Sequence, residues 1–223
     1  INEFLSDPPG SVDADLVGDS NGDGIRSSSE DEFVEIVNNT GSAIDLSGWN
    51  LTDEIGIRHT FPEGSTLPQG RAIVVFGGGN PTGVFGGAVV QTASQGNLGW
   101  SNSGDTISVV AGGAVVTAIS YDGDIGGSDQ GFSRNPDLSG AEDSTDMFDL
   151  YDEIATTDAL FTPGTQLDGS PFGDFDNTVT LELDTETVAE GAGSGAVSGT
   201  ITLESAAPAG GLTLTLESAG VDQ

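Results

Sequence analysis

Short apolar runs interrupted by Gly, Pro, Asn and Asp recur along the chain, and these regular interruptions limit the possible folds more than any other property of the sequence. No stretch keeps its apolar residues at a 3.6-residue period over the length of a typical helix. Runs of about four to eight β-branched and aromatic residues bounded by turn formers are typical of strands. The sequence therefore predicts an all-β protein, and the regular spacing of the strands favours a β-sandwich.

The predicted strands follow one another at short intervals through the first half of the chain. They are INEFLS (1–6), DEFVEIVNN (31–39), IDLSGWNLTD (44–53), RHTFP (58–62), AIVVFGG (72–78), TISVVA (106–111) and AVVTAISY (114–121). In the second of these, Phe33, Ile36 and Val37 break strict alternation. This indicates either one bulge or a strand that is buried on both faces.

One segment, residues 142–161, is a candidate for a short helix. Its residues Met147, Leu150, Tyr151 and Ile154 lie at helical spacing. The same segment is rich in acidic residues, so a loop with a solvated surface is the alternative.

The texture of the sequence changes at Thr178, where apolar and polar residues begin to alternate almost strictly. TVTLEL, GTITLES and LTLTLES are separated by the turns EGAGSG and APAGG. We therefore predict a first domain at 1–169, a linker at 170–177 and a second β-module at 178–223. A module this short lies at the margin for independent folding, so it is predicted to be a partial β-sandwich.

The charge of the chain limits its partners. Acidic residues number 36 against 4 basic ones and a single histidine, which gives a formal net charge of -32. Such a surface repels phosphates and anionic lipids and attracts divalent cations, so no direct binding of nucleic acid is expected. The longest apolar runs are too short for a membrane span, and the chain has no cysteine for disulfides. The opening at Ile1 suits a processed, secreted chain, and an extracellular or cell-surface location is expected.

The segment DSNGDGIRSSSE (19–30) matches the spacing of a calcium-binding loop. Asp19, Asn21 and Asp23 alternate along it, and their oxygens can converge only if the backbone turns sharply, which Gly24 permits. Because hard oxygen ligands favour Ca²⁺ over softer metals, calcium is the predicted cofactor.

The remaining ligands of this loop are less well defined by the sequence. The backbone carbonyl of Ile25 is a further candidate, and Glu30, Asp31 or Glu32 can close the site. Arg26 and the non-helical flanks depart from a helical calcium-binding hand, so the loop is predicted to be grafted onto a β scaffold. An acidic turn that only solvates its charges is the alternative.

Other acidic residues are weaker candidates for ion binding. The cluster at 142–153 fits a solvated surface better than a second ion site. Asp174 and Asp176 in DFDN can share an ion with Glu190 at the junction of the modules. Asp13 and Asp15 are further candidate ligands for the first loop.

Catalytic machinery is not evident in the sequence. His59 is the only histidine, and because no G-x-S-x-G elbow accompanies it, a structural role is favoured. Paired carboxylates for glycoside cleavage cannot be identified among so many acids. Trp49 and Trp100 are predicted core residues, with stacking on a sugar as the alternative for Trp100. Glycosylation sequons begin at Asn38 and Asn50.

Several unusual motifs occur in a characteristic order over about residues 1–169. They are INEFLSDP, DSNGDG, DEFVEIVNNTGSAIDLSGWNLTD, FPEGSTLPQGRAIVVFGGG, LGWSNSGDTISVV and SRNPD…FTPGTQLDG. This series resembles the lamin tail domain family, particularly its bacterial secreted members. The resemblance implies an immunoglobulin-like β-sandwich without catalysis, and it implies that Asp19, Asn21 and Asp23 hold calcium. The acidic insertion at 142–161 departs from the family's usual short loop.

From residue 178 the segment VAEGAG is similar to the V-x-E-x-x-G segment of a Calx-β domain. This resemblance implies that Glu190 can ligate calcium. The remaining strands belong either to a longer natural chain or to a neighbouring subunit that completes the sheet by β-augmentation, for which GLTLTLES offers an open edge. The second option predicts a homo-oligomer that serves as a filament or array subunit.

Three functions are compatible with these features. The leading hypothesis is a non-catalytic, calcium-stabilised extracellular module for surface adhesion or assembly, with other protein subunits or cell-surface components as partners. The second is an accessory or targeting region of a secreted nuclease, phosphatase or other hydrolase whose catalytic domain lies beyond residue 223. The third is a carbohydrate-binding module that recognises a glycan through Trp100.

Overall fold

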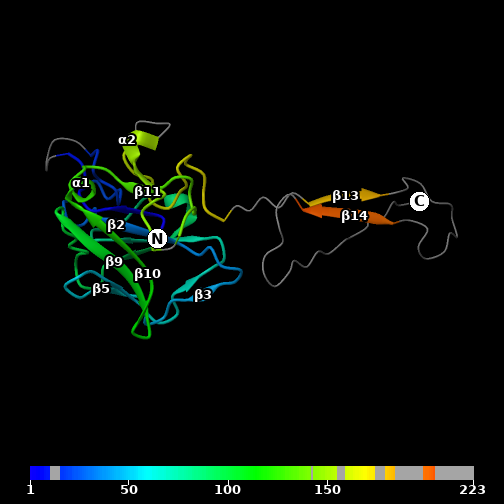
Figure 1. Cartoon of the computed structure of the whole chain (residues 1–223), viewed down its shortest axis with the longest axis horizontal. Helices are drawn as coiled ribbons and strands as arrows, with labels where there is room; N and C mark the ends of the chain where they lie inside the picture. The colour runs from blue at the N-terminus through cyan, green and yellow to red at the C-terminus, as the bar shows by residue number, and fades with distance from the viewer. Residues whose placement is uncertain (11–15, 142, 155–158, 174–178, 184–197, 204–223) are drawn as a thin grey trace. The chain divides into compact units, whose positions relative to one another are not determined.

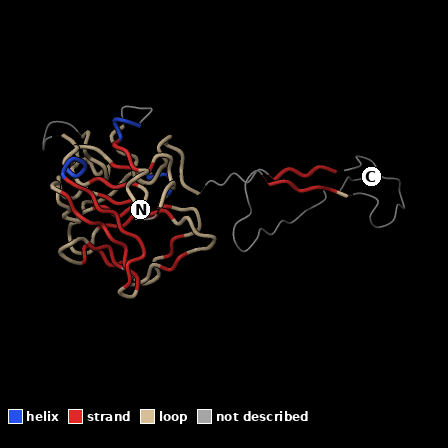
Figure 2. Tube along the Cα trace, viewed as in Figure 1, coloured by secondary structure: helices blue, strands red, loops and turns tan. Residues whose placement is uncertain are grey.

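The computed structural model describes residues 1–10, 16–141, 143–154, 159–173, 179–183 and 198–203. The chain separates into two compact units, Ile1–Asp174 and Phe175–Gln223, which are described separately below. Strands dominate the described residues, and the helices among them span a single turn (Figure 2). The predicted all-β class is confirmed.

The first unit contains a six-stranded sheet in the order β12-β11-β1-β2-β7-β8. Its strands are β1 (Glu3–Leu5), β2 (Phe33–Val37), β7 (Ala72–Phe76), β8 (Val89–Thr92), β11 (Phe132–Arg134) and β12 (Phe148–Leu150). Neighbouring strands are antiparallel except β7 and β8, which are parallel. The chain can return in the same direction because the 3-10 turn η1 (Phe85–Gly87) lies in the crossover between them.

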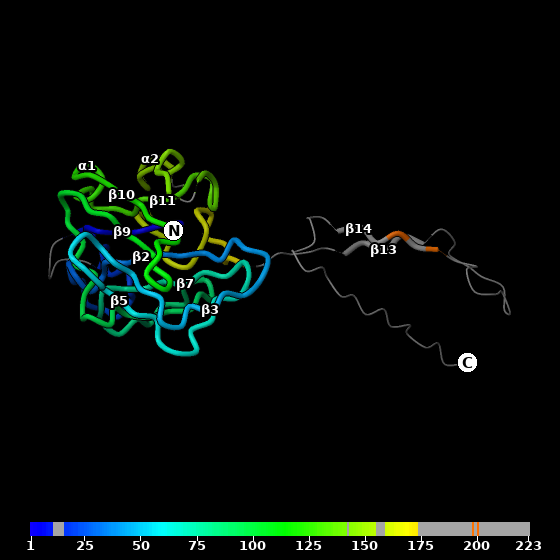
Figure 3. The backbone as a smooth tube through the Cα atoms, turned by 60° about the horizontal axis from the view of Figure 1, so that its bottom comes forward, coloured from blue at the N-terminus to red at the C-terminus, as the bar shows by residue number. Residues whose placement is uncertain are grey.

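A four-stranded antiparallel sheet has the order β10-β9-β4-β5. It contains β4 (Asn50–Thr52), β5 (Ile57–Thr60), β9 (Gly104–Ala111) and β10 (Ala114–Asp122). The long strands β9 and β10 run side by side as a hairpin, as Figures 1 and 3 show, and a short helix α1 (Gly123–Gly126) follows. A separate small sheet pairs β3 (Ile44–Asp45) with β6 (Thr66–Leu67).

The main core combines apolar side chains from both sheets. Val34 and Ile73 of the six-stranded sheet belong to the same buried cluster as Leu51 and Ile107 of the four-stranded sheet. The ring of Phe4 lies at the centre of an aromatic group formed with Trp100, Tyr121 and Phe132. This arrangement is an immunoglobulin-like β-sandwich, as expected.

Strand β2 is buried on both faces. Val34 and Ile36 belong to the core between the sheets, whereas Phe33 packs with Leu5, Val74 and Phe76 in a second, outer cluster. Phe85, Ala88, Val90 and Phe161 cover this outer cluster. Because β2 pairs with β7 residue by residue from Phe33–Phe76 to Val37–Ala72, the predicted irregularity reflects burial on both faces and not a bulge.

The short helix predicted within 142–161 is confirmed only as the single turn α2. Phe148–Leu150 forms strand β12, which pairs with β11, and only Tyr151–Ile154 forms a helical turn, α2. The backbone pairing of β12 with β11 outweighs the helical spacing of Met147 and Leu150. Residues 142 and 155–158 lie outside the described residues.

The described part of the second unit is a hairpin of β13 (Val179–Leu183) and β14 (Gly199–Leu203). The two strands pair antiparallel from Val179–Leu203 to Leu183–Gly199. They correspond to the predicted strands TVTLEL and GTITLES. The third predicted strand, in LTLTLES, lies outside the described residues.

Candidate functional site

The loop at residues 19–24 is closed by its own side chains. The Asp19 carboxylate accepts hydrogen bonds from the amides of Asp23 (3.1 Å) and Gly24 (2.9 Å). Asn21 Oδ1 accepts from the Asp23 amide (3.0 Å), and Asp23 Oδ1 accepts from the Ile25 amide (2.9 Å). Gly24 has a φ of 89°, which permits the sharp turn that the sequence predicts here. The structure therefore brings Asp19, Asn21 and Asp23 together.

This loop contacts the segment that follows β7. Asp23 Oδ2 accepts a hydrogen bond from the Asn80 amide (3.0 Å), and Asn21 Nδ2 donates to the Gly78 carbonyl oxygen (3.4 Å). Gly79 lies between these contacts with a φ of 72°. A Cβ atom at Gly79 would lie 2.5 Å from both Asn21 Nδ2 and Asp23 Oδ2, so only glycine leaves room for the two side chains.

Of the predicted closing residues, Asp31 is the one that bonds directly to this loop. Its carboxylate is buried and accepts hydrogen bonds from the amides of Asn21 (3.1 Å) and Ser27 (2.6 Å). Burial raises the pKa of Asp31, and the negative charges of Asp19 and Asp23 raise it further. Asp31 therefore belongs to the same electrostatic neighbourhood as the three loop residues.

The other predicted ligands lie in different positions. The side chain of Glu30 lies over Gly78. At Ile25 the predicted ligand is the backbone carbonyl, and the residue as a whole is 65% exposed. Glu32 is directed elsewhere, because its carboxylate accepts a hydrogen bond from the Gly99 amide (2.7 Å). Burial raises the pKa of Glu32 to about 8. The structure therefore does not bring Glu32 together with the loop.

The remaining acidic candidates add no described ligand to the loop. Of the cluster at 142–153, Asp143, Asp146, Asp152 and Glu153 are exposed, as expected for a solvated surface. Five further candidates lie outside the described residues: Asp13, Asp15, Asp174, Asp176 and Glu190.

The donor set of the loop is compatible with calcium. Within the described ranges, no group of three or more His, Cys, Asp and Glu side chains is arranged to hold a metal ion. The loop instead combines two carboxylates with the amide oxygen of Asn21, and Ca²⁺ accepts such mixed oxygen ligands. Carboxylate and amide oxygens of this kind are ligands that a hard cation accepts.

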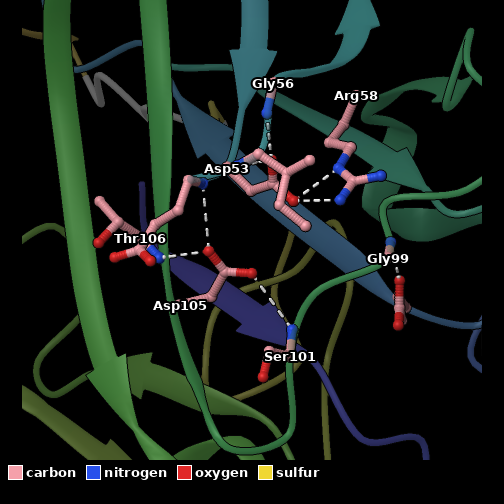
Figure 4. A network of polar contacts seen from close by, with 10 residues as sticks. Asp53, Gly56, Arg58, Gly99, Ser101, Asp105 and Thr106 are labelled. Carbon is pink, nitrogen blue, oxygen red and sulfur yellow. Dashed lines mark hydrogen bonds and ion pairs between the residues drawn. The ribbon is translucent and has the colours of Figure 1, made fainter.

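A second polar network joins the β4–β5 turn to the loop before β9 (Figure 4). Arg58 forms an ion pair with Asp53, and the distance from Arg58 Nε to Asp53 Oδ2 is 2.6 Å. Burial alone would raise the pKa of Asp53, but the hydrogen bonds from Arg58 and from two backbone amides outweigh it and lower the pKa. Asp105 accepts from the amides of Ser101 (3.2 Å) and Thr106 (2.7 Å). These carboxylates hold loops in place, a role that sequence reasoning missed.

His59 has the surroundings of a structural residue. Its side chain is buried, Nε2 lies 2.8 Å from Gln91 Oε1, and Nδ1 accepts a hydrogen bond from the Ser94 amide (3.2 Å). Burial lowers the pKa of His59 and thereby favours the neutral imidazole. Both ring nitrogens have protein partners, as the structural interpretation requires.

The tryptophans also have structural positions. Trp100 is 4% exposed and packs edge-on against Phe4, and Trp49 packs partly buried against the same core. Because a buried ring cannot stack on a sugar, the alternative of glycan recognition through Trp100 is wrong.

The two sequons differ in accessibility. Asn38 is 2% exposed, and its Nδ2 donates to the carbonyl oxygens of Ser42 (2.8 Å) and Leu67 (2.9 Å). Asn50 lies on β4 and is partly exposed. Of the two, Asn50 is the more exposed, and its side chain forms hydrogen bonds with Gly48 and Thr60.

A cavity of about 290 Å³ is lined mainly by apolar side chains. Ile36, Ile44, Leu46, Trp49, Val109 and Val116 contribute to its wall. None of the described residues that line it carries a charged side chain. The cavity therefore contains no carboxylate pair of the kind that glycoside cleavage requires.

The fold and these contacts define an immunoglobulin-like β-sandwich whose polar groups mainly hold loops in place. The sequence profile described as Lamin Tail Domain matches residues 1–123, which is more than half of the chain. The chain therefore belongs to the lamin tail domain family, a family of non-catalytic immunoglobulin-like domains. No curated protein matches the sequence.

The match confirms the lamin tail resemblance over residues 1–123 of the predicted 1–169, whereas the Calx-β resemblance from residue 178 stays a prediction. The family match ends at residue 123, but the first compact unit continues to Asp174 and includes β11 and β12. Among the described residues, no helix is long and apolar enough to cross a membrane.

Proposed function

We propose that this chain is a non-catalytic, calcium-stabilised module of an extracellular or cell-surface protein, and that it serves in adhesion or assembly with other protein subunits. The observation that carries the proposal is the contact between two loops that are distant in sequence. Asp23 accepts a hydrogen bond from the Asn80 amide while Asp19 and Asn21 surround the same turn.

Asp19, Asn21 and Asp23 would hold the ion, and Asp31 contributes a buried negative charge beside them. A bound Ca²⁺ would offset the repulsion among the converging carboxylates. The chain itself supplies the turn at Gly24, and Gly79 leaves room for the side chains of Asn21 and Asp23. Calcium would thereby strengthen the contact between residues 19–24 and the segment after β7.

The test is thermal unfolding of the chain with calcium and with a chelator. At a calcium concentration of about 100 times Kd, binding to the native state contributes about 2.7 kcal/mol. For a chain of this size, chelation should therefore lower Tm by about 5–10 °C. Equal Tm values in both conditions would contradict the structural role of the ion.

A matched pair of variants separates calcium binding from a general change of charge. The double variant Asp19→Asn, Asp23→Asn should abolish the difference in Tm between calcium and chelator. Glu54 and Glu63 are exposed and lie outside the loop. The control Glu54→Gln, Glu63→Gln removes the same charge and should keep the calcium effect.

The assembly part of the proposal is supported by strand β10. It is an edge strand of the four-stranded sheet, contains neither proline nor lysine, and exposes Val115 (63%) and Val116 (52%). Natural edge strands usually carry proline or lysine, which prevent pairing with other chains. Light scattering in calcium and about 1 M salt, where repulsion is screened, should detect oligomers that Val115→Lys prevents. A monomer at every concentration would count against self-assembly.

A further inference from the structure

Two buried glutamates lie opposite each other on the outer face of the six-stranded sheet. Glu3 on β1 pairs with Glu35 on β2 in the antiparallel register, and both have 0% exposure. Like charges directly opposite one another on neighbouring strands are destabilising. Two ionised carboxylates at this position would also lose their hydration, so the fold strongly disfavours double ionisation.

Both glutamates bind one segment, residues 160–167, which we call the strap. The Thr162 amide donates to Glu3 Oε1 (3.0 Å), and the Thr162 hydroxyl lies 3.2 Å from Glu3 Oε2. The Gly164 amide donates to Glu35 Oε2 (2.7 Å). The strap also contributes Phe161, whose ring packs edge-on against Phe33 in the outer cluster.

The other ionisable groups around the pair come from several elements. Asp137, after β11, shares the Asn2 side chain with Glu35 and accepts a hydrogen bond from the Leu167 amide. Tyr151, on α2, interacts with Glu3 through its hydroxyl. Asp168 lies on the surface, and its negative charge raises the pKa of Asp137. Arg134, on β11, donates to the carbonyl oxygens of Ile1 and Ala141.

The pKa shifts agree with this geometry. Burial raises the pKa of Glu3 to about 8, and the hydrogen bonds from Thr162 offset only part of this effect. Burial also raises the pKa of Glu35 well above its usual range, and the charge of Glu3 raises it further. The folded state therefore binds more protons than the unfolded chain from the ordinary glutamate pKa of 4.5 up to about 8.

We propose that a proton held by the buried pair Glu3 and Glu35 latches the strap onto the outer face of the sheet, and that losing this proton in alkaline solution releases the strap while the β-sandwich stays folded. Release exposes Phe33 and its neighbours in the outer cluster. Residues between the strap and the second unit stay attached to the first unit, since Phe172 is 3% exposed and its carbonyl oxygen accepts a hydrogen bond from Arg71.

The test is amide hydrogen exchange of the full chain at several pH values, with each rate corrected for the intrinsic effect of pH. The Thr162 and Gly164 amides should lose protection by about tenfold or more between about pH 6 and about pH 9. The amides of the β9–β10 hairpin should lose some protection as the whole sandwich loses stability, but they should remain much better protected than the strap at about pH 9. Unchanged protection of the strap, or a hairpin that exchanges as fast as the strap at about pH 9, would overturn the proposal.

Two substitutions at the pair identify the groups that titrate. Glu35→Gln retains a hydrogen-bond acceptor for Gly164 but cannot ionise, so protection of the strap should become nearly independent of pH. Glu3→Gln provides the same test from the other strand, should one variant fold poorly. If both folded variants lose protection as the wild type does, the pair is not the latch.

Glu32→Gln is the matched control. Glu32 is also buried with a pKa raised to about 8, but it binds the Gly99 amide and not the strap. This variant should therefore keep the release of the strap at high pH. A strap that becomes insensitive to pH in Glu32→Gln would assign the effect to global stability and contradict the latch.

Discussion

Among single residues, Gly79 decides whether the loop at 19–24 can hold its side chains in place. We predict that Gly79→Ala weakens calcium binding by about tenfold or more, because the new Cβ meets Asn21 and Asp23 at 2.5 Å. Gly48 has a φ of 73°, close to the 72° of Gly79, and a Cβ there meets no atom within 4 Å. Gly48→Ala therefore controls for backbone strain, and calorimetric titration should show its calcium affinity unchanged. Equal affinities in both variants would contradict the cradle at Gly79.

Glu32 links the stability of the sandwich to pH. Because its pKa is raised in the folded state to about 8, the native state loses stability as the pH rises from 4.5 to about 8. Glu32→Gln can accept the Gly99 hydrogen bond without ionising. We predict that it gains about 2–4 kcal/mol over the wild type at about pH 9 and little at about pH 4.

Urea unfolding of both proteins at the two pH values measures this gain. Glu63→Gln removes an exposed acid and should leave the pH dependence of the wild type intact. If Glu32→Gln is as sensitive to pH as the wild type, the buried carboxyl is ionised without cost.

At the scale of elements, strand β2 contributes side chains both to the main core and to the outer cluster. We predict that Phe33→Ala lowers the free energy of unfolding by about 3–5 kcal/mol, since it removes a fully buried ring from the outer cluster. Ile55 is 84% exposed, so Ile55→Ala should change the stability by less than about 0.5 kcal/mol. Urea denaturation checks both values. A loss below about 1 kcal/mol in Phe33→Ala would mean that the outer cluster contributes little.

The strands that the sequence predicts are those with long apolar runs, such as β7 and β10. Strands β11 and β12 consist of FSR and FDL and were not predicted, because neither lies in a longer run of apolar residues. They form where the chain pairs with β1 and with each other. The IDLSGWNLTD run likewise divides into β3 and β4, since the chain turns at Gly48.

In the candidate site too, the nearby sequence predicts the positions of some residues, whereas tertiary contacts decide the positions of others. The spacing of Asp19, Asn21 and Asp23 predicts their convergence because all three lie in one turn. The directions of Asp31 and Glu32 depend on how the chain enters β2, and this is set by tertiary contacts. One signal for the buried pair was available in FVEIV, since a glutamate inside a strand with two apolar faces must itself be buried.

The net charge of -32 acts on the whole molecule. We predict that sodium chloride raises Tm by several degrees between ~10 mM and ~1 M, as the Debye length falls from ~30 to ~3 Å and repulsion among the carboxylates is screened. A chelator in every sample separates this effect from calcium binding. A Tm that falls with salt would show that attractive pairs such as Asp53–Arg58 dominate the electrostatics.

The family match and the folding unit end at different places. A fragment cut after Gly123 would lack β11 and β12, which occupy one side of β1 in the six-stranded sheet. The backbone groups along one edge of β1 would then be unpaired, and the carboxylates of Glu3 and Glu35 would no longer be covered. A fusion protein that carries this domain must therefore include the residues up to the end of the first unit. The family match ends at residue 123, about 50 residues before Asp174, the last residue of that unit.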